Sequence, residues 1–96
     1  SKQQIDRKTI EKSLCKKGFV KEEGDHRYYY HEVDGKRTGP YAKISKGTQY
    51  KTYHVSLINF LKMQLCLKNL KDAFDLLQCP MSGTEYIENL KKNGLI

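Results

Sequence analysis

The chain has 96 residues and a formal net charge of +7, and a chain of this length corresponds to one domain. Its hydrophobic content of 38%, with seven Tyr and three Phe, excludes a disordered tail. No apolar run approaches the ~20 residues of a membrane span, and no signal sequence opens the chain. We therefore expect no membrane partner and a cytoplasmic location.

The cysteines are three in number and widely spaced, at Cys15, Cys66 and Cys79. No C-x-x-C motif occurs, so the spacing indicates neither a zinc site nor a thioredoxin-like motif. The pattern favours reduced, partly buried thiols. We expect no metal and no cofactor.

The positive charge is concentrated in the first half of the chain. Residues 1–51 carry 13 Lys and Arg against 7 Asp and Glu, a net of +6, whereas residues 52–96 carry a net of +1. A polyanionic partner is therefore expected to meet the first half.

A helix is predicted over about 6–17, with Asp6 as N-cap and Gly18 as the stop. Apolar spacing places Ile10, Leu14 and Cys15 on its core face.

Three antiparallel strands are predicted next, over 19–23, 26–33 and 36–45. Asp34-Gly35 is a strong signal for a two-residue hairpin turn, because such turns need positive φ angles. Gly39-Pro40 predicts a bulge or an edge position in the third strand. The stretch from Ser45 to Tyr53 is polar and is interpreted as a loop.

Tyrosines dominate the second predicted strand. Alternation places Tyr28 and Tyr30 on one face with His26, and Tyr29 and His31 on the other. Which face meets the helices stays open. His31 is expected at the surface or in a cross-strand pair.

Helices fill the rest of the chain. The first begins near 54–56 and carries a core face of Leu57, Ile58, Leu61, Leu65 and Cys66. The second is capped by Asn69 and ends at 78–80, and the third begins with a Ser82–Glu85 capping box and runs to about Asn93.

The predicted fold class is α+β: a helix, a three-stranded antiparallel sheet and a helix, as in double-stranded-RNA-binding domains, with two extra C-terminal helices. We expect residues 1–67 to form this unit and residues 68–96 to form a helical extension packed on it.

The segments Gly18-Phe19 and Gly24-Asp25-His26-Arg27-Tyr28-Tyr29-Tyr30 resemble the HicA family of toxin ribonucleases, over about residues 7–65. In that family the second strand starts with Gly-Ser-His, and here Asp25 replaces the Ser. The resemblance implies a double-stranded-RNA-binding-type fold, metal-independent cleavage of mRNA and inhibition by a HicB-like antitoxin. It implies that His26 is the catalytic residue and that Gly24 is the family's glycine.

The chain also differs from that family at two places. The third strand reads Gly39-Pro40-Tyr41-Ala42, where the family has Val-Pro-x-His. The C-terminal helices from about Asn69 exceed the usual length of such toxins.

The residues themselves suit RNA chemistry. Histidine is the residue type best suited to general acid or base catalysis, so His26 would have that role, and Gly24 with Asp25 would form a supporting turn that orients it. Phosphate contacts are predicted for Arg27, Lys43, Lys46 and Lys51. Base stacking or groove contacts are predicted for Tyr28, Tyr30 and Tyr41.

Two histidines keep alternative interpretations. His26 is otherwise an ordinary surface residue of a Tyr-rich strand. His54, near a helix start, is either a surface residue or a replacement for the missing third-strand His.

Three functions follow as hypotheses. The first is a toxin-type, metal-independent endoribonuclease that cleaves mRNA. The second is a non-catalytic RNA-binding module on the same fold. The third is a protein-interaction adaptor that uses the appended helices.

Overall fold

The computed structural model describes residues 4–45, 51–78 and 80–96. In chain order the elements are β1 (Gln4–Asp6), α1 (Arg7–Lys16), β2 (Phe19–Glu23), β3 (Arg27–Val33), β4 (Lys36–Ile44), β5 (Thr52–His54), α2 (Val55–Gln64), α3 (Leu70–Leu77) and α4 (Gly83–Lys92). The described residues thus form an α+β protein with a three-stranded antiparallel sheet, a two-stranded sheet and four helices, which confirms the predicted class.

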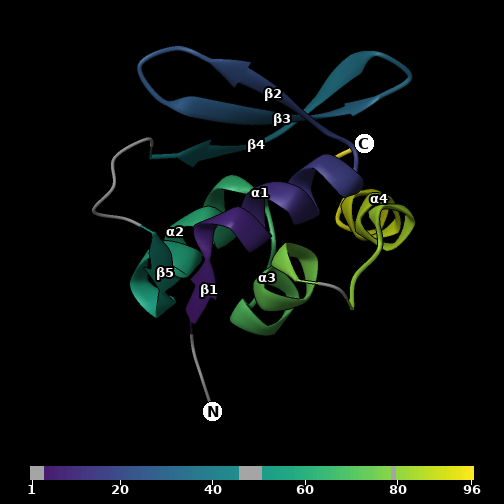
Figure 1. Ribbon diagram of the computed structural model, residues 1–96. Coiled ribbons are helices and arrows are strands. Elements are labelled where there is room, and N and C mark those ends of the chain that lie inside the picture. The colour runs from purple at the N-terminus through teal and green to yellow at the C-terminus, as the bar shows by residue number, and fades with distance from the viewer. Residues whose placement is uncertain (1–3, 46–50, 79) are drawn as a thin grey trace.

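The three-stranded sheet has the order β2-β3-β4, and the helices lie on one side of it (Figure 1). On that side α1 packs against β2, and α2 packs against β4 and β5. The helix α3 contacts both α1 and α2. None of the four helices in the described ranges lies on the opposite face of the sheet, which we call the outer face.

The strand signals are confirmed in detail. Asp34 and Gly35 have φ angles of 52° and 79°, as the predicted hairpin turn requires. The pairing of β3 with β4 shifts register between Tyr30 and Glu32, opposite the segment that contains Gly39 with its φ of 121°. The Gly39-Pro40 segment is therefore a bulge, and it lies in a strand at the sheet's edge.

The first helix follows its prediction except at Cys15 and at its cap, since Asp6 is at the N-cap position but its side chain forms no capping hydrogen bond. Ile10 and Leu14 are buried, and the chain leaves the helix at Gly18 with a φ of 93°. Cys15 is exposed, so its predicted place on the core face is wrong. Ser13 is buried in that region instead, because its hydroxyl donates to the Gln78 carbonyl at 3.0 Å.

A second, two-stranded sheet was not predicted. Antiparallel pairing of β1 with β5 places Ile5 opposite Tyr53, and both side chains are buried. The predicted loop of 45–53 therefore contains the start of a strand at Thr52. Within that predicted loop, residues 46–50 lie outside the described part of the chain.

The C-terminal helices share the core of the remaining chain. Ala73, Leu76, Leu77, Tyr86 and Leu90 belong to the same buried cluster as Ile10, Leu14 and Ile58. Both predicted caps are present: Asn69 accepts from the Asp72 N–H, and Ser82 and Glu85 form a capping box. None of the helices in the described ranges is long and apolar enough to cross a membrane.

His31 lies in this core. Its side chain is fully buried, so the predicted surface position is wrong, whereas the cross-strand alternative is confirmed by its pairing with Phe19. The imidazole lies 5.0 Å from both the Phe19 and Tyr86 rings, and Nδ1 hydrogen-bonds to Thr38. Burial lowers the pKa of His31 below its ordinary value.

Candidate functional site

His26 and Lys43 line one hollow at the end of the three-stranded sheet. Its volume is about 190 Å³, and its other lining residues are Ser45, Tyr53, Leu57, Phe60 and Leu61. His26 is half-buried and directly precedes β3. The Gly24 N–H donates to the His26 carbonyl at 3.0 Å, so Gly24, Asp25 and His26 form a tight turn at this place.

Lys43 belongs to β4, and its backbone is held against α2 at this hollow. Lys43 stands opposite Tyr28 in the sheet, and its backbone N–H donates to the Gln64 side chain of α2 at 3.1 Å. Its side chain is exposed and forms no ion pair with the described residues. The hollow thus has a basic residue and a histidine in one lining, a combination that suits the binding of a phosphate group near a proton acceptor.

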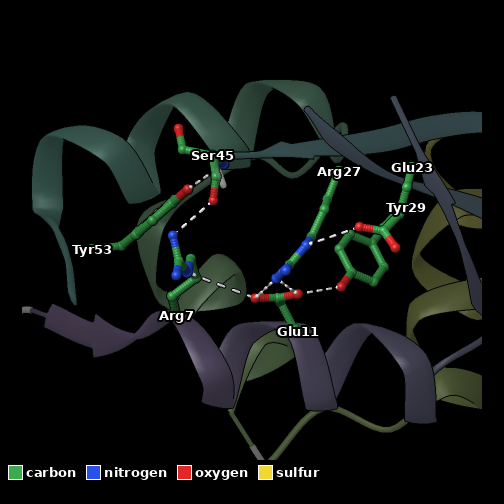
Figure 2. A network of polar contacts seen from close by, with 7 residues as sticks. All are labelled: Arg7, Glu11, Glu23, Arg27, Tyr29, Ser45 and Tyr53. Atoms are coloured by element: carbon green, nitrogen blue, oxygen red, sulfur yellow. Dashed lines mark hydrogen bonds and ion pairs between the residues drawn. The ribbon is translucent and has the colours of Figure 1, made fainter. Parts of the chain in front are cut away.

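The end of β4, which forms the rim of the hollow, is fastened on two sides (Figure 2). The Ser45 N–H donates to the Tyr53 hydroxyl at 3.1 Å, and the Arg7 guanidinium donates to the Ser45 carbonyl at 2.8 Å. These bonds connect β4 to both β5 and α1. The hollow is therefore built from parts of the chain that are distant in sequence.

Arg27 is not among the residues that line this hollow and belongs instead to an ion-pair network on the helix side of the sheet (Figure 2). Its Nη1 donates to both carboxylate oxygens of Glu11 at 3.0 and 3.2 Å, and its Nε donates to Glu23 at 3.4 Å. The Glu11 charge is the main cause of the raised pKa of Arg27. This guanidinium already has two carboxylate partners, so its predicted role in phosphate binding receives no support from the geometry.

Glu11 is the centre of this network. It also accepts from the Tyr29 hydroxyl at 2.5 Å and lies 3.7 Å from Nε of Arg7. Burial, followed by the bond to Glu11, raises the pKa of Tyr29. The network joins α1 to the sheet and leaves Tyr29 as a structural residue.

Three tyrosines form a row on the outer face. The rings of Tyr28 and Tyr30 lie 6.0 Å apart with an interplanar angle of 18°, and the Tyr30 and Tyr41 rings also lie 6.0 Å apart. The Arg37 guanidinium carbon lies 3.8 Å from the Tyr30 ring centroid, as in a cation–π pair. The predicted grouping of Tyr28 with Tyr30 is confirmed, and Tyr41 joins them from β4.

Lys51, the remaining predicted phosphate ligand that the structure describes, is not among the residues that line the His26 hollow. Lys51 lines a different hollow of about 310 Å³, together with Asp6, Arg7, Lys8 and Thr52. Lys46 lies outside the described residues. His54 is exposed in β5 and is not among the residues that line the His26 hollow.

A basic row on α1 was not predicted. Lys8, Lys12 and Lys16 are all exposed. Their spacing of four residues puts them on one helix face, and this spacing was a readable signal in the sequence. No group of three or more His, Cys, Asp or Glu side chains within the described ranges is arranged to hold a metal ion.

Comparison with known proteins gives no match: no protein-family model, no curated protein and no solved structure is significantly similar to the chain.

Proposed function

We propose that the protein is a metal-independent endoribonuclease of the toxin type that cleaves mRNA. The observation that carries the proposal is the shared hollow of His26 and Lys43. In support, the order of helix, three-stranded sheet and helix, with α1 and α2 on one side, agrees with the layout of double-stranded-RNA-binding domains.

The reaction would use the 2′-hydroxyl of the RNA as nucleophile. An imidazole nitrogen of His26 takes the proton of that hydroxyl, and the 2′-oxygen forms a bond to phosphorus. The bond from phosphorus to the 5′-oxygen breaks, and this oxygen takes a proton from water. The products are a 2′,3′-cyclic phosphate and a 5′-hydroxyl, and the Lys43 ammonium stabilises the charge on the phosphorane.

The experiment is a cleavage assay on single-stranded RNA with His26→Ala. General acid–base catalysis contributes about 10²–10⁴-fold, so the variant should lose activity by at least about 100-fold. His54→Ala is the matched control, because His54 is exposed and lies outside the lining of the hollow. Unchanged cleavage by His26→Ala, with an intact fold, would refute the assignment.

Two further cleavage measurements test the roles of the RNA 2′-hydroxyl and of Lys43. A substrate with a 2′-deoxy sugar at the cleaved position should resist cleavage, since it lacks the attacking group. Lys43→Gln should reduce the cleavage rate and leave the fold intact, because this side chain has no ion-pair partner in the described structure. The resemblance to toxins adds an expectation of growth inhibition that a HicB-like antitoxin relieves.

A second candidate is a non-catalytic RNA-binding module. It is favoured by the absence of a second histidine from the described lining of the hollow and by the engagement of Arg27 with Glu11. It predicts RNA binding that weakens with salt, together with no cleavage by the unmodified chain.

A further inference from the structure

We propose that the outer face of the sheet binds single-stranded RNA by stacking unpaired bases on Tyr28, Tyr30 and Tyr41. The choice of RNA as the ligand rests on the proposed function, whereas base stacking on this face can be measured without any cleavage. Sheets whose aromatic side chains stack two or three bases are an established way of binding single strands.

The tyrosine row is accessible. The helices pack on the other side of the sheet, so no described element covers it (Figure 1). Tyr41 is 37% exposed, and Val20, which pairs with Tyr30 from β2, is 48% exposed. Tyr28 and Tyr30 are partly exposed, so all three rings can be reached by a ligand on this face.

The hydroxyl groups distinguish this row from the structural tyrosines. Tyr29 donates to Glu11, Tyr86 donates to the Leu65 carbonyl, and Tyr53 accepts from the Ser45 N–H. In contrast, the hydroxyls of Tyr28, Tyr30 and Tyr41 form no hydrogen bond within the described ranges. The fold uses the first group for its core, and it leaves the row free to meet a ligand.

Cations flank the row and favour a nucleic acid as its occupant. Arg37 lies over Tyr30, and Lys43 stands opposite Tyr28. Lys43 also lines the His26 hollow, so a strand stacked along the row would lead to the proposed reactive site. An apolar protein partner would give the Lys43 ammonium no anionic group to pair with.

The aromatic surface selects a single strand over a duplex. Stacking needs the face of a base, and in a duplex these faces are covered by neighbouring base pairs. The acidic residues Glu22 and Glu32 share the outer face, and Glu22 pairs with Arg37. Phosphate contacts are therefore few, and most of the affinity is expected from the rings.

The test measures binding by fluorescence anisotropy with a single-stranded RNA decamer, using full-length protein that carries His26→Ala to prevent cleavage. Stacking on one aromatic ring corresponds to roughly 5- to 100-fold in Kd, so Tyr41→Ala should weaken binding within that range. Tyr41→Phe retains the ring and should restore the Kd to within about twofold of the parent. A matched change on the opposite side, Lys12→Gln with Lys16→Gln, should leave the Kd within about threefold.

Salt dependence supplies an independent readout. Arg37 is already paired with Glu22, so the one phosphate contact expected, by Lys43, predicts a slope of log K against log salt of about −0.7 for a single strand. A Tyr41→Ala variant with the parent's Kd would overturn the inference and leave this face to a protein partner. A larger loss from the Lys12 and Lys16 changes than from Tyr41→Ala would overturn it too, because RNA would then lie on α1.

The inference and the proposed function fail in different ways. If the unmodified protein never cuts RNA but the tyrosine variants lose binding, the stacking surface stands and the catalytic assignment is refuted. If the protein cuts RNA through His26 but the tyrosine variants bind normally, the catalytic assignment stands and the stacking surface is refuted.

Discussion

Lys17 is a buried cation whose removal should destabilise the whole fold. Its side chain is only 7% exposed, and its ammonium donates to the carbonyl oxygens of Leu76 and Gln78 at 2.5 and 2.6 Å. These carbonyls lie at the C-terminal end of α3, where backbone carbonyl oxygens accept no hydrogen bond from within the helix. Lys17 thereby joins the end of α1 to the end of α3.

The expected cost follows from these two bonds. A hydrogen bond to a charged group contributes about 1.5–3 kcal/mol, and a buried carbonyl left without a partner carries a desolvation penalty. Ser13 continues to donate to the Gln78 carbonyl, so we expect Lys17→Met to lower the free energy of unfolding by about 2–4 kcal/mol. For a domain of this size, that corresponds to a fall in Tm of roughly 10–25 °C.

The assay is urea unfolding followed by circular dichroism, with Lys16→Met as the matched control. Lys16 is the neighbouring residue and is exposed, so its replacement should change the free energy of unfolding by less than about 0.5 kcal/mol. Equal stability of the two variants would refute the reasoning, because it would mean that the ammonium does not satisfy the end of α3.

Three further predictions concern the core. A Cβ added at Gly83 would lie 3.1 Å from the Cα of Lys17. Although a change from Gly to Ala usually stabilises a helix, Gly83→Ala should therefore lower the free energy of unfolding by about 1–3 kcal/mol. A variant more stable than the parent would contradict this. Burial lowers the pKa of His31 in the folded state, so the unfolded chain binds more protons as pH falls below the ordinary value of 6.5. Stability should therefore be highest above that pH and decrease on acidification, and a comparison of unfolding at pH 5 and pH 7.5 should show a weaker dependence for His31→Gln. Tyr29→Phe should cost about 1–2 kcal/mol in urea unfolding through loss of its bond to a carboxylate, whereas Tyr28→Phe should be nearly neutral, and equal effects would count against the network.

Local signals in the sequence predicted the elements well. The Asp34-Gly35 turn, the Asn69 cap and the Ser82–Glu85 box depend on residues within a few positions of one another. For such features the chain provides both partners in one short segment, so the pattern alone indicates the structure.

Features that depend on distant partners were missed. The pairing of β1 with β5 joins two three-residue segments across most of the first half of the chain. His31 and Lys17 are polar residues that are buried because Thr38, Tyr86 and the end of α3 surround them. No pattern near these residues indicates such partners.

In the candidate site, too, local patterns were predictable and contacts with distant residues were not. Alternation along β3 separated Tyr28 and Tyr30 from Tyr29, but it did not show which face the helices would cover. Arg27 is paired with Glu11, sixteen positions earlier on α1, and no pattern near Arg27 indicated this partner. Lys43 joined His26 because α2 holds the edge of β4 through Gln64.

The bulge at Gly39 affects whether two copies of the chain can pair through their strand edges. An exposed strand edge is a template for pairing with another chain, and an aromatic sheet face adds to that risk. On β4 the bulge interrupts the edge, and Gln64 occupies the Lys43 N–H beyond it. On β2 the exposed Lys21, Glu22 and Glu23 place charges along the other edge. These two edges disfavour the growth of sheets from copy to copy, so the aromatic surface of one copy is not drawn into a sheet shared with another.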